Sequence, residues 1–512
     1  MKRSMLIFPL LCMMAAAGKA QHLSPLWTDF VKAKAQGKTP ILPDFSYAGY
    51  HWSEKELPTL AEKKVFKVAD YGAIANDELF DDAAIQKAVD AAEANPGGGI
   101  VFFESGKYLI APDEDAKKQI RISKSGIILK GSGSGAGGTE IYQANMRIHG
   151  RQFLFQPKNV TGKKLSTIVE DAGRETFSVK LNDASMLKVG QDVVIRHRTE
   201  EFTRLYFAPL DLKPQWSRLF GDKGGMQIYE IHTIAKITGN QVVFKNPIHL
   251  DIKLVKTGTW DIESYTALSE CGIEDLRFSS NWKNYPEAFI HHKNEIHDYA
   301  YEAVGMEYLK DSWIRNCEFH DLNEGIFIRS GYRMTIENTH FRGKKGHASV
   351  HARTGYGVLV KNCSFNGAQH HGAGTGYSAV GTVITKCSLG IDQNFDIHSG
   401  QPYATLYDEV QGGVFYNLGG PEPGYPHHGK QLVLWNFHHR SLKDQHYDFW
   451  DSSRRRNYTI ALPILVGFTA DKVVTFEHAG RNESQGEAVL PSSLFEAQLQ
   501  LRLKGIDLAN AK

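Results

Sequence analysis

The 512-residue chain is 42% apolar and carries 59 basic against 57 acidic residues. This apolar content is enough for a large buried core and argues against a disordered chain. A nearly neutral chain lacks the overall basic surface that binds nucleic acid, so any anion site must be formed locally.

The N-terminus has the pattern of a secretory signal. Lys2 and Arg3 precede an apolar run from Met5 to Ala17, and small residues follow at Gly18 and Ala20. This order predicts a signal peptide over residues 1–20 and a mature protein that is secreted or periplasmic. No later run is apolar enough to predict a membrane span.

An amphipathic helix is predicted next. In FKVADYGAIANDELFDDAAIQKAVDAAEANPGGGIVFFESGKYLI (66–110), Asp82 is expected to cap the helix N-terminus. Apolar side chains follow at helical spacing and form one stripe: Ala84, Ile85, Ala88, Val89 and Ala92. The glycine-rich run 96–99 then ends the helix before a strand at 100–103.

A different pattern occupies the middle of the first half. Segments 177–198 and 228–252 alternate apolar and polar residues, and Gly239-Asn240 lies inside the second one. Such alternation around a two-residue turn predicts antiparallel hairpin strands. We therefore expect a small β-rich module inserted at 165–255.

The second half repeats a six-residue pattern with an asparagine in third position. It occurs in IRNCEF (314–319), IENTHF (336–341) and VKNCSF (360–365), and more loosely in IEDLRF (273–278), ITKCSL (384–389), FYNLGG (415–420) and LWNFHH (434–439). Periods in the low twenties without an intervening helix predict a solenoid of short parallel strands. The equivalent cysteines, Cys317, Cys363 and Cys387, should then stack inside as free thiols.

The segment 66–110 resembles the opening signature of the pectate-lyase-like superfamily, which includes polygalacturonases, tailspikes and polysaccharide lyases. The resemblance implies an all-β fold, a right-handed parallel β-helix with an N-terminal capping helix. Together with the insertion, it predicts these segments: signal peptide 1–20, N-terminal extension 21–60, first turns with the capping helix 61–164, inserted module 165–255, main turns 256–440, and last turns with a C-terminal cap 441–512.

Candidate functional residues gather in THFRGKKGHASVHARTGYG (339–357) and in the two turns after it. His347 lies eight residues after Thr339, and His371 lies eight after Cys363, which predicts that the two imidazoles occupy neighbouring turns of one groove. The predicted catalytic residues are His347, His351, Arg353, His371 and His398. The predicted substrate-binding residues are Arg329, Lys344, His370, Tyr377, Asn394 and Asp396. His291 and His292 lie in an insertion that could reach the same groove.

Local cations suit an anionic poly- or oligosaccharide, and elimination from a uronic acid suits arginine and histidine. Arg353, helped by Arg329, would bind the carboxylate, His347 or His371 would be the base, and His351, His398 or Tyr377 would be the acid. The mature chain is also similar to exported bacterial β-helix enzymes that cleave uronate polymers or dehydrate ulvan-type oligosaccharides.

Two other functions stay open. A hydrolase of the polygalacturonase type needs close carboxylates, but that family's Asn-Thr-Asp and Asp-Asp elements are missing. A non-catalytic glycan-binding solenoid would use surface aromatics such as Trp216, Trp282 and Tyr285. No metal-ligand spacing stands out, so no metal site is assigned, although calcium or zinc is not excluded. The sequence does not determine the oligomeric state.

Overall fold

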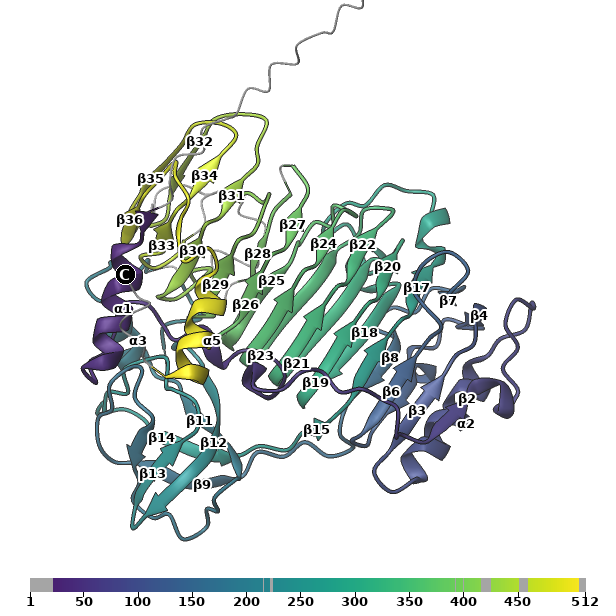
Figure 1. Ribbon diagram of the computed structural model, residues 1–512, viewed down its shortest axis with the longest axis horizontal. Coiled ribbons are helices and arrows are strands. Elements are labelled where there is room, and N and C mark those ends of the chain that lie inside the picture. The colour runs from purple at the N-terminus through teal and green to yellow at the C-terminus, as the bar shows by residue number, and fades with distance from the viewer. Residues whose placement is uncertain are drawn as a thin grey trace, which may run out of the picture.

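The computed structural model describes residues 22–214, 216–221, 224–391, 393–398, 400–415, 425–450 and 459–505. Parallel strands wind into an elongated β-helix, drawn with its coils side by side in Figure 1. The predicted signal peptide lies outside the described residues. The all-β prediction of a parallel β-helix with an N-terminal helix and an inserted module is confirmed.

The largest sheet has eighteen strands: β2 (Val65–Lys67), β3 (Gly99–Phe102), β5 (Ile120–Ile122), β6 (Ile127–Lys130), β8 (Arg151–Phe155), β15 (Leu268–Ser269), β16 (Gly272–Glu274), β18 (Glu302–Glu307), β19 (Leu309–Arg315), β21 (Glu324–Glu337), β23 (Ala348–Lys361), β25 (Gly374–Val380), β26 (Val383–Thr385), β28 (Asp396–His398), β29 (Thr405–Asp408), β30 (Leu432–Trp435), β33 (Ile464–Val466) and β36 (Arg481–Glu483). A second parallel sheet contains β4 (Gly106–Ile110), β7 (Thr139–Gln143), β17 (Arg277–Ser280), β20 (Glu318–His320), β22 (His340–Arg342), β24 (Ser364–Phe365) and β27 (Ser388–Leu389). Three short parallel pairs lie outside these two sheets: β1 (His22–Leu23) with β37 (Val489–Leu490), β31 (His438–His439) with β34 (Thr469–Ala470), and β32 (Gln445–Asp448) with β35 (Val474–Glu477).

The asparagine repeat turns the chain from the first sheet to the second. Asn316, Asn338 and Asn362 have φ values of 55°, 49° and 55°, in the left-handed region that asparagine tolerates better than most residues. Just after each bend, phenylalanines pack in a ladder, with Phe319 and Phe341 stacked at 4.9 Å between ring centroids. The four cysteines of the described chain are buried free thiols, so the prediction of interior thiols agrees with the structure.

One predicted copy of the repeat is wrong. Phe415 does not take the predicted strand position equivalent to Ile384 but packs against Phe395, at 4.5 Å between ring centroids, and Asn417 lies outside the described residues. The coil after Ile384 instead uses Tyr407, which is paired in register with Ile384 and Leu434. Its bend carries a glutamate in place of asparagine, which is why the pattern missed it.

Helix α2 (Asp82–Ala94) closes the N-terminal end of the coils. Its buried residues, Ile85, Ala88, Val89 and Ala92, are those of the predicted apolar stripe. The predicted cap is shifted by one position: the N-cap is Asp81, and Asp82 is the first helical residue. The Asp82 carboxylate accepts a hydrogen bond from the backbone N–H of Ala111 instead of capping its own helix.

The inserted module is an antiparallel sheet of six strands: β9 (Lys164–Ile168), β10 (Ser178–Lys180), β11 (Asp192–His197), β12 (Ile228–Thr238), β13 (Gln241–Phe244) and β14 (Trp260–Ser264). The predicted end at 255 is too early, because β14 pairs with both β9 and β11. Helix α3 (Glu200–Phe207) belongs to this segment. The module lies beside the coils at the end away from β2 and β3 (Figure 1).

The module covers the C-terminal halves of the long strands. The Tyr356 hydroxyl, on β23, donates to the carbonyl of Pro247, and the Tyr332 hydroxyl, on β21, donates to Asn246. Helices α1 (Pro25–Ala35) and α5 (Leu494–Lys504) bury apolar residues in the same outer core. Only the N-terminal halves of β21 and β23 are left for other partners, and the candidate site lies there.

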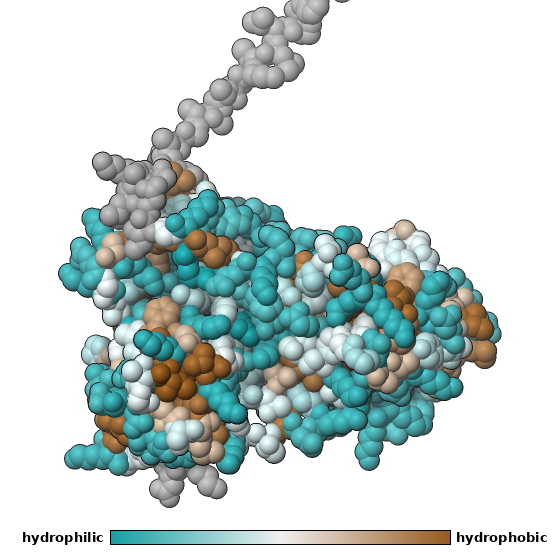
Figure 2. Space-filling model, turned by 60° about the horizontal axis from the view of Figure 1, so that its bottom comes forward, coloured by the Kyte–Doolittle hydropathy of each residue, from teal (hydrophilic) through white to brown (hydrophobic). Residues whose placement is uncertain are grey.

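Hydrophobic side chains gather only in small separate areas of the face shown in Figure 2, which is otherwise hydrophilic. A further short helix, α4 (Glu295–Tyr299), lies in an insertion before β18. Within the described part of the chain, no helix combines the length and the apolar character needed to cross a bilayer.

Candidate active site

Strand register aligns functional side chains across four coils. Arg329 on β21 pairs with Arg353 on β23, which pairs with Gly376 on β25, which pairs with His398 on β28. A second row runs beside it, in which His351 pairs with Gly374 and Gly374 with Asp396. Side chains far apart in sequence therefore meet, because successive parallel strands lie about 4.8 Å apart.

We call the resulting group the histidine cluster; it consists of His291, His347, His351, His370, His371 and His398, with Asp396 and Arg353. The ring centroids of His347 and His371 are 5.0 Å apart, and the backbone N–H of His371 donates to the carbonyl of His347. These two residues thus occupy neighbouring turns. Their catalytic roles remain predictions.

Asp396 lies at the centre of the cluster and is fully buried. Its two oxygens lie 3.2 Å from His351 Nε2 and 3.2 Å from His371 Nδ1. Both contacts are within ion-pair distance but miss hydrogen-bond alignment, so neither carboxylate oxygen has a hydrogen bond within the described residues. Burial raises the pKa of Asp396 to about 6, and His398 and Arg353 oppose that shift.

The ring nitrogens of His347 have different partners. Nδ1 lies 2.8 Å from the carbonyl oxygen of Asp298, which can only accept, so Nδ1 carries the proton. Nε2 is then a lone-pair nitrogen, and it is buried without a hydrogen-bond partner among the described residues. Burial lowers the pKa of this imidazole.

Burial separates the cluster into a deep layer and an accessible edge. His351 and His371 are each 1% exposed and His347 is 7% exposed, whereas Tyr377 is 40% exposed and Arg353 and His398 are half-buried. The predicted open groove therefore does not expose all of its predicted residues. Desolvation lowers the pKa of His398 to about 3 and that of His370 to about 2, so both rings are neutral.

The accessible edge is built around Arg353. Its Nε donates to His351 Nδ1 at 3.1 Å, and its guanidinium lies over the rings of Phe327 and Tyr377, 5.2 and 5.4 Å from their centroids. Its charge acts on Asp396 and Glu324 from a distance, but Arg353 forms no direct ion pair with a carboxylate of the described residues. The remaining guanidinium N–H groups are consequently available to an external anion.

Two backbone features shape this edge. A Cβ added to Gly376 would lie 3.0 Å from both His351 Nε2 and His398 Cβ, so glycine leaves open the row position between Arg353 and His398. The ladder then shifts register by one residue, and Tyr377 has φ 54° in this bulge. Bulges re-aim side chains, and this one turns the Tyr377 ring outward, parallel to His398 at 6.4 Å between centroids.

The other predicted binding residues have protein partners. Arg329 is paired with Glu307 at 2.5 Å. The Lys344 ammonium lies over the Trp282 ring, 4.8 Å from its centroid, and donates to the carbonyl of Tyr285, so it supports the insertion and not the cluster. Asn394 is buried two residues before Asp396.

The expectation that the insertion carrying His291 could reach the groove agrees with the structure: His291 Nε2 lies 3.3 Å from His371 Nε2. Sequence reasoning missed a pair of carboxyl groups. On the other side, Glu302 pairs in register with Glu324, and both are buried. Burial, and then the charge of Glu324, raises the pKa of Glu302 well above its usual range, and the hydrogen bond between the two carboxyl groups lowers the pKa of Glu324. Their spacing of 22 residues, equal to one repeat, was the available signal.

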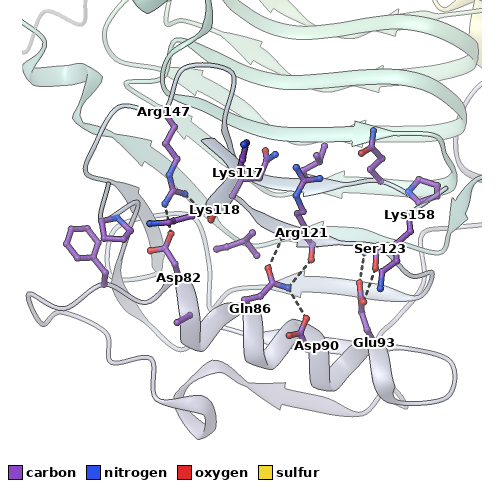
Figure 3. A pocket seen from close by; sticks show the side chains of 18 residues that line it. Asp82, Gln86, Asp90, Glu93, Lys117, Lys118, Arg121, Ser123, Arg147 and Lys158 are labelled. Atoms are coloured by element: carbon purple, nitrogen blue, oxygen red, sulfur yellow. Dashed lines mark hydrogen bonds and ion pairs between the residues drawn. The ribbon is translucent and has the colours of Figure 1, made fainter. Parts of the chain in front are cut away.

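A cavity of about 840 Å³ lies elsewhere, between α2 and the first coils (Figure 3). Its polar side chains are largely bonded to their neighbours: Asp82 pairs with Arg147 at 3.1 Å, and Glu93 accepts from Ser123. The described residues that line it include no histidine, whereas the histidine cluster combines six imidazoles with a buried aspartate and an arginine. We therefore place the candidate active site at the histidine cluster.

Known proteins match parts of the chain. An alignment of 175 residues with the mannuronan C5-epimerase AlgE3 of Azotobacter vinelandii has 29% identity. It covers 34% of this chain and 9% of that protein. An alignment of 70 residues with alginate lyase 7 of the same organism has 37% identity and covers 14% of this chain and 8% of that one. The chain thus spans less than a tenth of the length of these relatives.

Solved structures also resemble this one. The A-module of mannuronan C5-epimerase AlgE4 from Azotobacter vinelandii has 13% identity and a TM-score of 0.40, with 83% of this chain and 96% of that chain covered. The tailspike gp49 of Pseudomonas phage LKA1 has 13% identity and a TM-score of 0.45, with 83% and 81% covered.

Three family models match the sequence. Residues 262–399 match a right-handed β-helix region, and residues 368–508 match a domain of unknown function, DUF4955. Residues 65–327, more than half of the chain, match the model described as rhamnogalacturonase A/epimerase, pectate lyase-like. This right-handed parallel β-helix protein therefore belongs to the rhamnogalacturonase A/epimerase, pectate-lyase-like family.

Proposed function

We propose that the protein is a carbon–oxygen lyase that acts by β-elimination on uronic acid residues of an anionic poly- or oligosaccharide. The observation that carries this proposal is the accessible edge: Arg353 forms no direct ion pair with a carboxylate of the described chain and lies beside an exposed tyrosine and a half-buried, neutral histidine. Elimination from a uronate needs a cation for the carboxylate, a base and an acid, and these three residues supply them.

In the proposed reaction, Arg353 binds the C6 carboxylate and makes the hydrogen on C5 more acidic. His351 holds the guanidinium through the Nε–H···Nδ1 hydrogen bond and leaves its outer N–H groups facing the substrate. His398, whose ring is neutral, takes the C5 proton, and the Tyr377 hydroxyl protonates the oxygen that leaves C4. The C5–H and C4–O bonds break, a C4=C5 double bond forms, and the product is a 4,5-unsaturated uronate.

This assignment moves the base from His347 or His371, the residues favoured by their spacing, to His398. His371 is 1% exposed and His347 is 7% exposed, so a sugar cannot contact either ring without displacement of the insertion that carries His291. The deep layer then acts as a positioning layer, in which His351 orients Arg353 and Asp396 lies between two imidazoles.

The relatives support an acidic polysaccharide as substrate, since their names include mannuronan epimerases and an alginate lyase. Within that class we propose a uronate-containing, ulvan-like chain. The leaving group is either a sugar, as in a polysaccharide lyase, or water from a non-reducing end, as in an oligosaccharide dehydratase. We also propose that the protein is exported, on the signal-like pattern of residues 1–20.

A hydrolase is the second candidate, and the buried Glu302–Glu324 pair is the observation that favours it, because hydrolases use close carboxyl groups as acid and base. Both side chains are nearly inaccessible, which makes this candidate the weaker one. The glycan-binding alternative expected Trp216 and Trp282 on the surface, where they would stack on sugars. Both side chains are fully buried, so that expectation was wrong.

The test is to incubate the protein with alginate, pectin and ulvan, and with oligosaccharides from each, while recording ultraviolet absorbance and product masses. Elimination gives an absorbing conjugated product, and the loss of one water from an intact oligosaccharide identifies dehydration. New reducing ends without that absorbance would establish hydrolysis and overturn the proposal. Binding without any product would indicate a glycan-binding protein.

A further inference from the structure

We infer that His291, His370 and His371 form a binding site for a zinc ion. One ring nitrogen from each residue can be chosen so that all three lie within 4.8 Å of one another. The inference goes beyond the proposed lyase function and does not depend on it, because it concerns the affinity of the folded chain for a metal.

The two facing nitrogens are the first observation. His371 Nε2 and His291 Nε2 lie 3.3 Å apart, and the rings of His291 and His370 lie 4.0 Å apart between centroids. Three imidazoles from two separate segments thus converge at one place. Such convergence needs a reason, because like groups gain little from contact with one another unless a proton or a cation lies between them.

An unsatisfied nitrogen is the second observation. His370 Nε2 is buried and has no hydrogen-bond partner among the described residues. A buried polar atom without a partner is costly, and an ion at this position would supply one.

Asp396 supplies the third observation. Its carboxylate lies 3.2 Å from Nδ1 of His371, on the side of the ring opposite the Nε2 that faces His291. This contact is within ion-pair distance but is not aligned as a hydrogen bond. A carboxylate at this place would be the outer partner of a metal-binding histidine once the two groups align, because such a hydrogen bond fixes the tautomer of the ring.

The chemistry of the three donors selects the ion. Neutral imidazole nitrogens suit zinc and neighbouring transition metals, whereas calcium and magnesium prefer oxygen ligands. Three protein ligands would leave the fourth position of a tetrahedral zinc for water or a substrate oxygen. The His347 ring, whose Nε2 has no hydrogen-bond partner among the described residues, lies 5.3 Å from the His291 ring between centroids.

A second set of possible donors shares His291 and adds His292 and Asp298. His292 Nδ1 already bonds to the Asp298 carboxylate at 2.8 Å, so these two groups satisfy each other. In the set containing His370, the two Nε2 atoms of His291 and His371 face each other, but His370 Nε2 has no hydrogen-bond partner among the described residues, and this unsatisfied nitrogen is why we prefer that set. The two sets also make opposite predictions for substitution of His292.

The experiment strips the full chain with a chelator and titrates it with zinc chloride against a chromophoric competitor. We expect one zinc per chain, a visible spectrum of tetrahedral cobalt on substitution with cobalt chloride, and a higher unfolding temperature with zinc. His370→Ala and His291→Ala should weaken zinc binding at least about 100-fold, and His292→Ala should leave it nearly unchanged.

Circular dichroism of each variant without metal checks that the coils still fold. Wild-type protein that binds zinc no more tightly than calcium would overturn the inference. So would full zinc affinity in His370→Ala, or loss of affinity in His292→Ala alone, which would place the ion in the other set. None of these measurements uses turnover, so their outcome is separate from that of the lyase test.

Discussion

Replacing Arg353 by lysine, with Arg329→Lys as the matched control, separates the two arginines of one row. Lysine keeps the positive charge but loses the Nε–H that donates to His351 at 3.1 Å and the planar fork that fits a carboxylate. A hydrogen bond to a charged group contributes about 1.5–3 kcal/mol. At about 1.4 kcal/mol per tenfold change, kcat/KM should fall about 10- to 150-fold.

Arg329→Lys should change kcat/KM by less than about fivefold. Its guanidinium is committed to Glu307, and its side chain is 49% exposed, where an ion pair contributes only about 0.2–1 kcal/mol. The assay follows the ultraviolet absorbance of the unsaturated product at several concentrations of a uronate oligosaccharide, with an unfolding scan of each variant. Equal losses in both variants would refute the idea that only Arg353 faces the substrate.

Four further changes probe the edge, the C-terminal cap and the buried carboxyl pair. Tyr377→Phe keeps the ring over Arg353 but removes the proposed acid, so kcat should fall about 100-fold with little change in KM, measured by steady-state kinetics. Gly376→Ala places a Cβ 3.0 Å from His351 and from His398 and should lower kcat at least about tenfold. The control Gly135→Ala, whose added Cβ has nothing within 4 Å, should behave as wild type in the same assay. Asp408→Ala removes the carboxylate that accepts from the N-terminus of α5 and should lower the free energy of unfolding by about 2–3 kcal/mol in denaturant titrations. Folded protein holds the Glu302 proton more tightly than unfolded protein, so the free energy of unfolding should fall as pH rises above 4.5. Glu302→Gln should flatten that decline in denaturant titrations repeated across pH. An unchanged slope would contradict the proton shared with Glu324.

The coil architecture was predictable because its signals are local and repeated. A left-handed bend favours asparagine at each turn, and a phenylalanine three residues later fills the interior beside its equivalents, as with Phe319 and Phe341. The prediction failed where another residue took the same conformation. Glu409 has φ 51° at the bend of the coil that contains Tyr407, and a search for asparagine could not find it.

The site was predictable only in part, for a related reason. Equal offsets within the repeat bring His347 and His371 together, but an offset does not show how deeply a side chain is covered. That depends on the insertion that carries His291, which has no counterpart in the other coils. Pairings such as Arg329 with Glu307 are likewise invisible, because they depend on which outward side chains from adjacent coils touch each other.

The contrast between the two arginines explains why a layer of neutral imidazoles is useful beneath an anion site. Arg329 already has a carboxylate partner, so a substrate anion would have to displace Glu307 before it gained the guanidinium. Arg353 is held instead by a neutral ring, which accepts one hydrogen bond, and the nearby buried carboxyl groups act on its charge without a direct ion pair. A substrate carboxylate then provides that direct ion pair, at a position where burial on one side strengthens the attraction. Histidine suits this support better than aspartate or glutamate because it can accept the Nε–H without neutralising the guanidinium, and burial keeps it neutral.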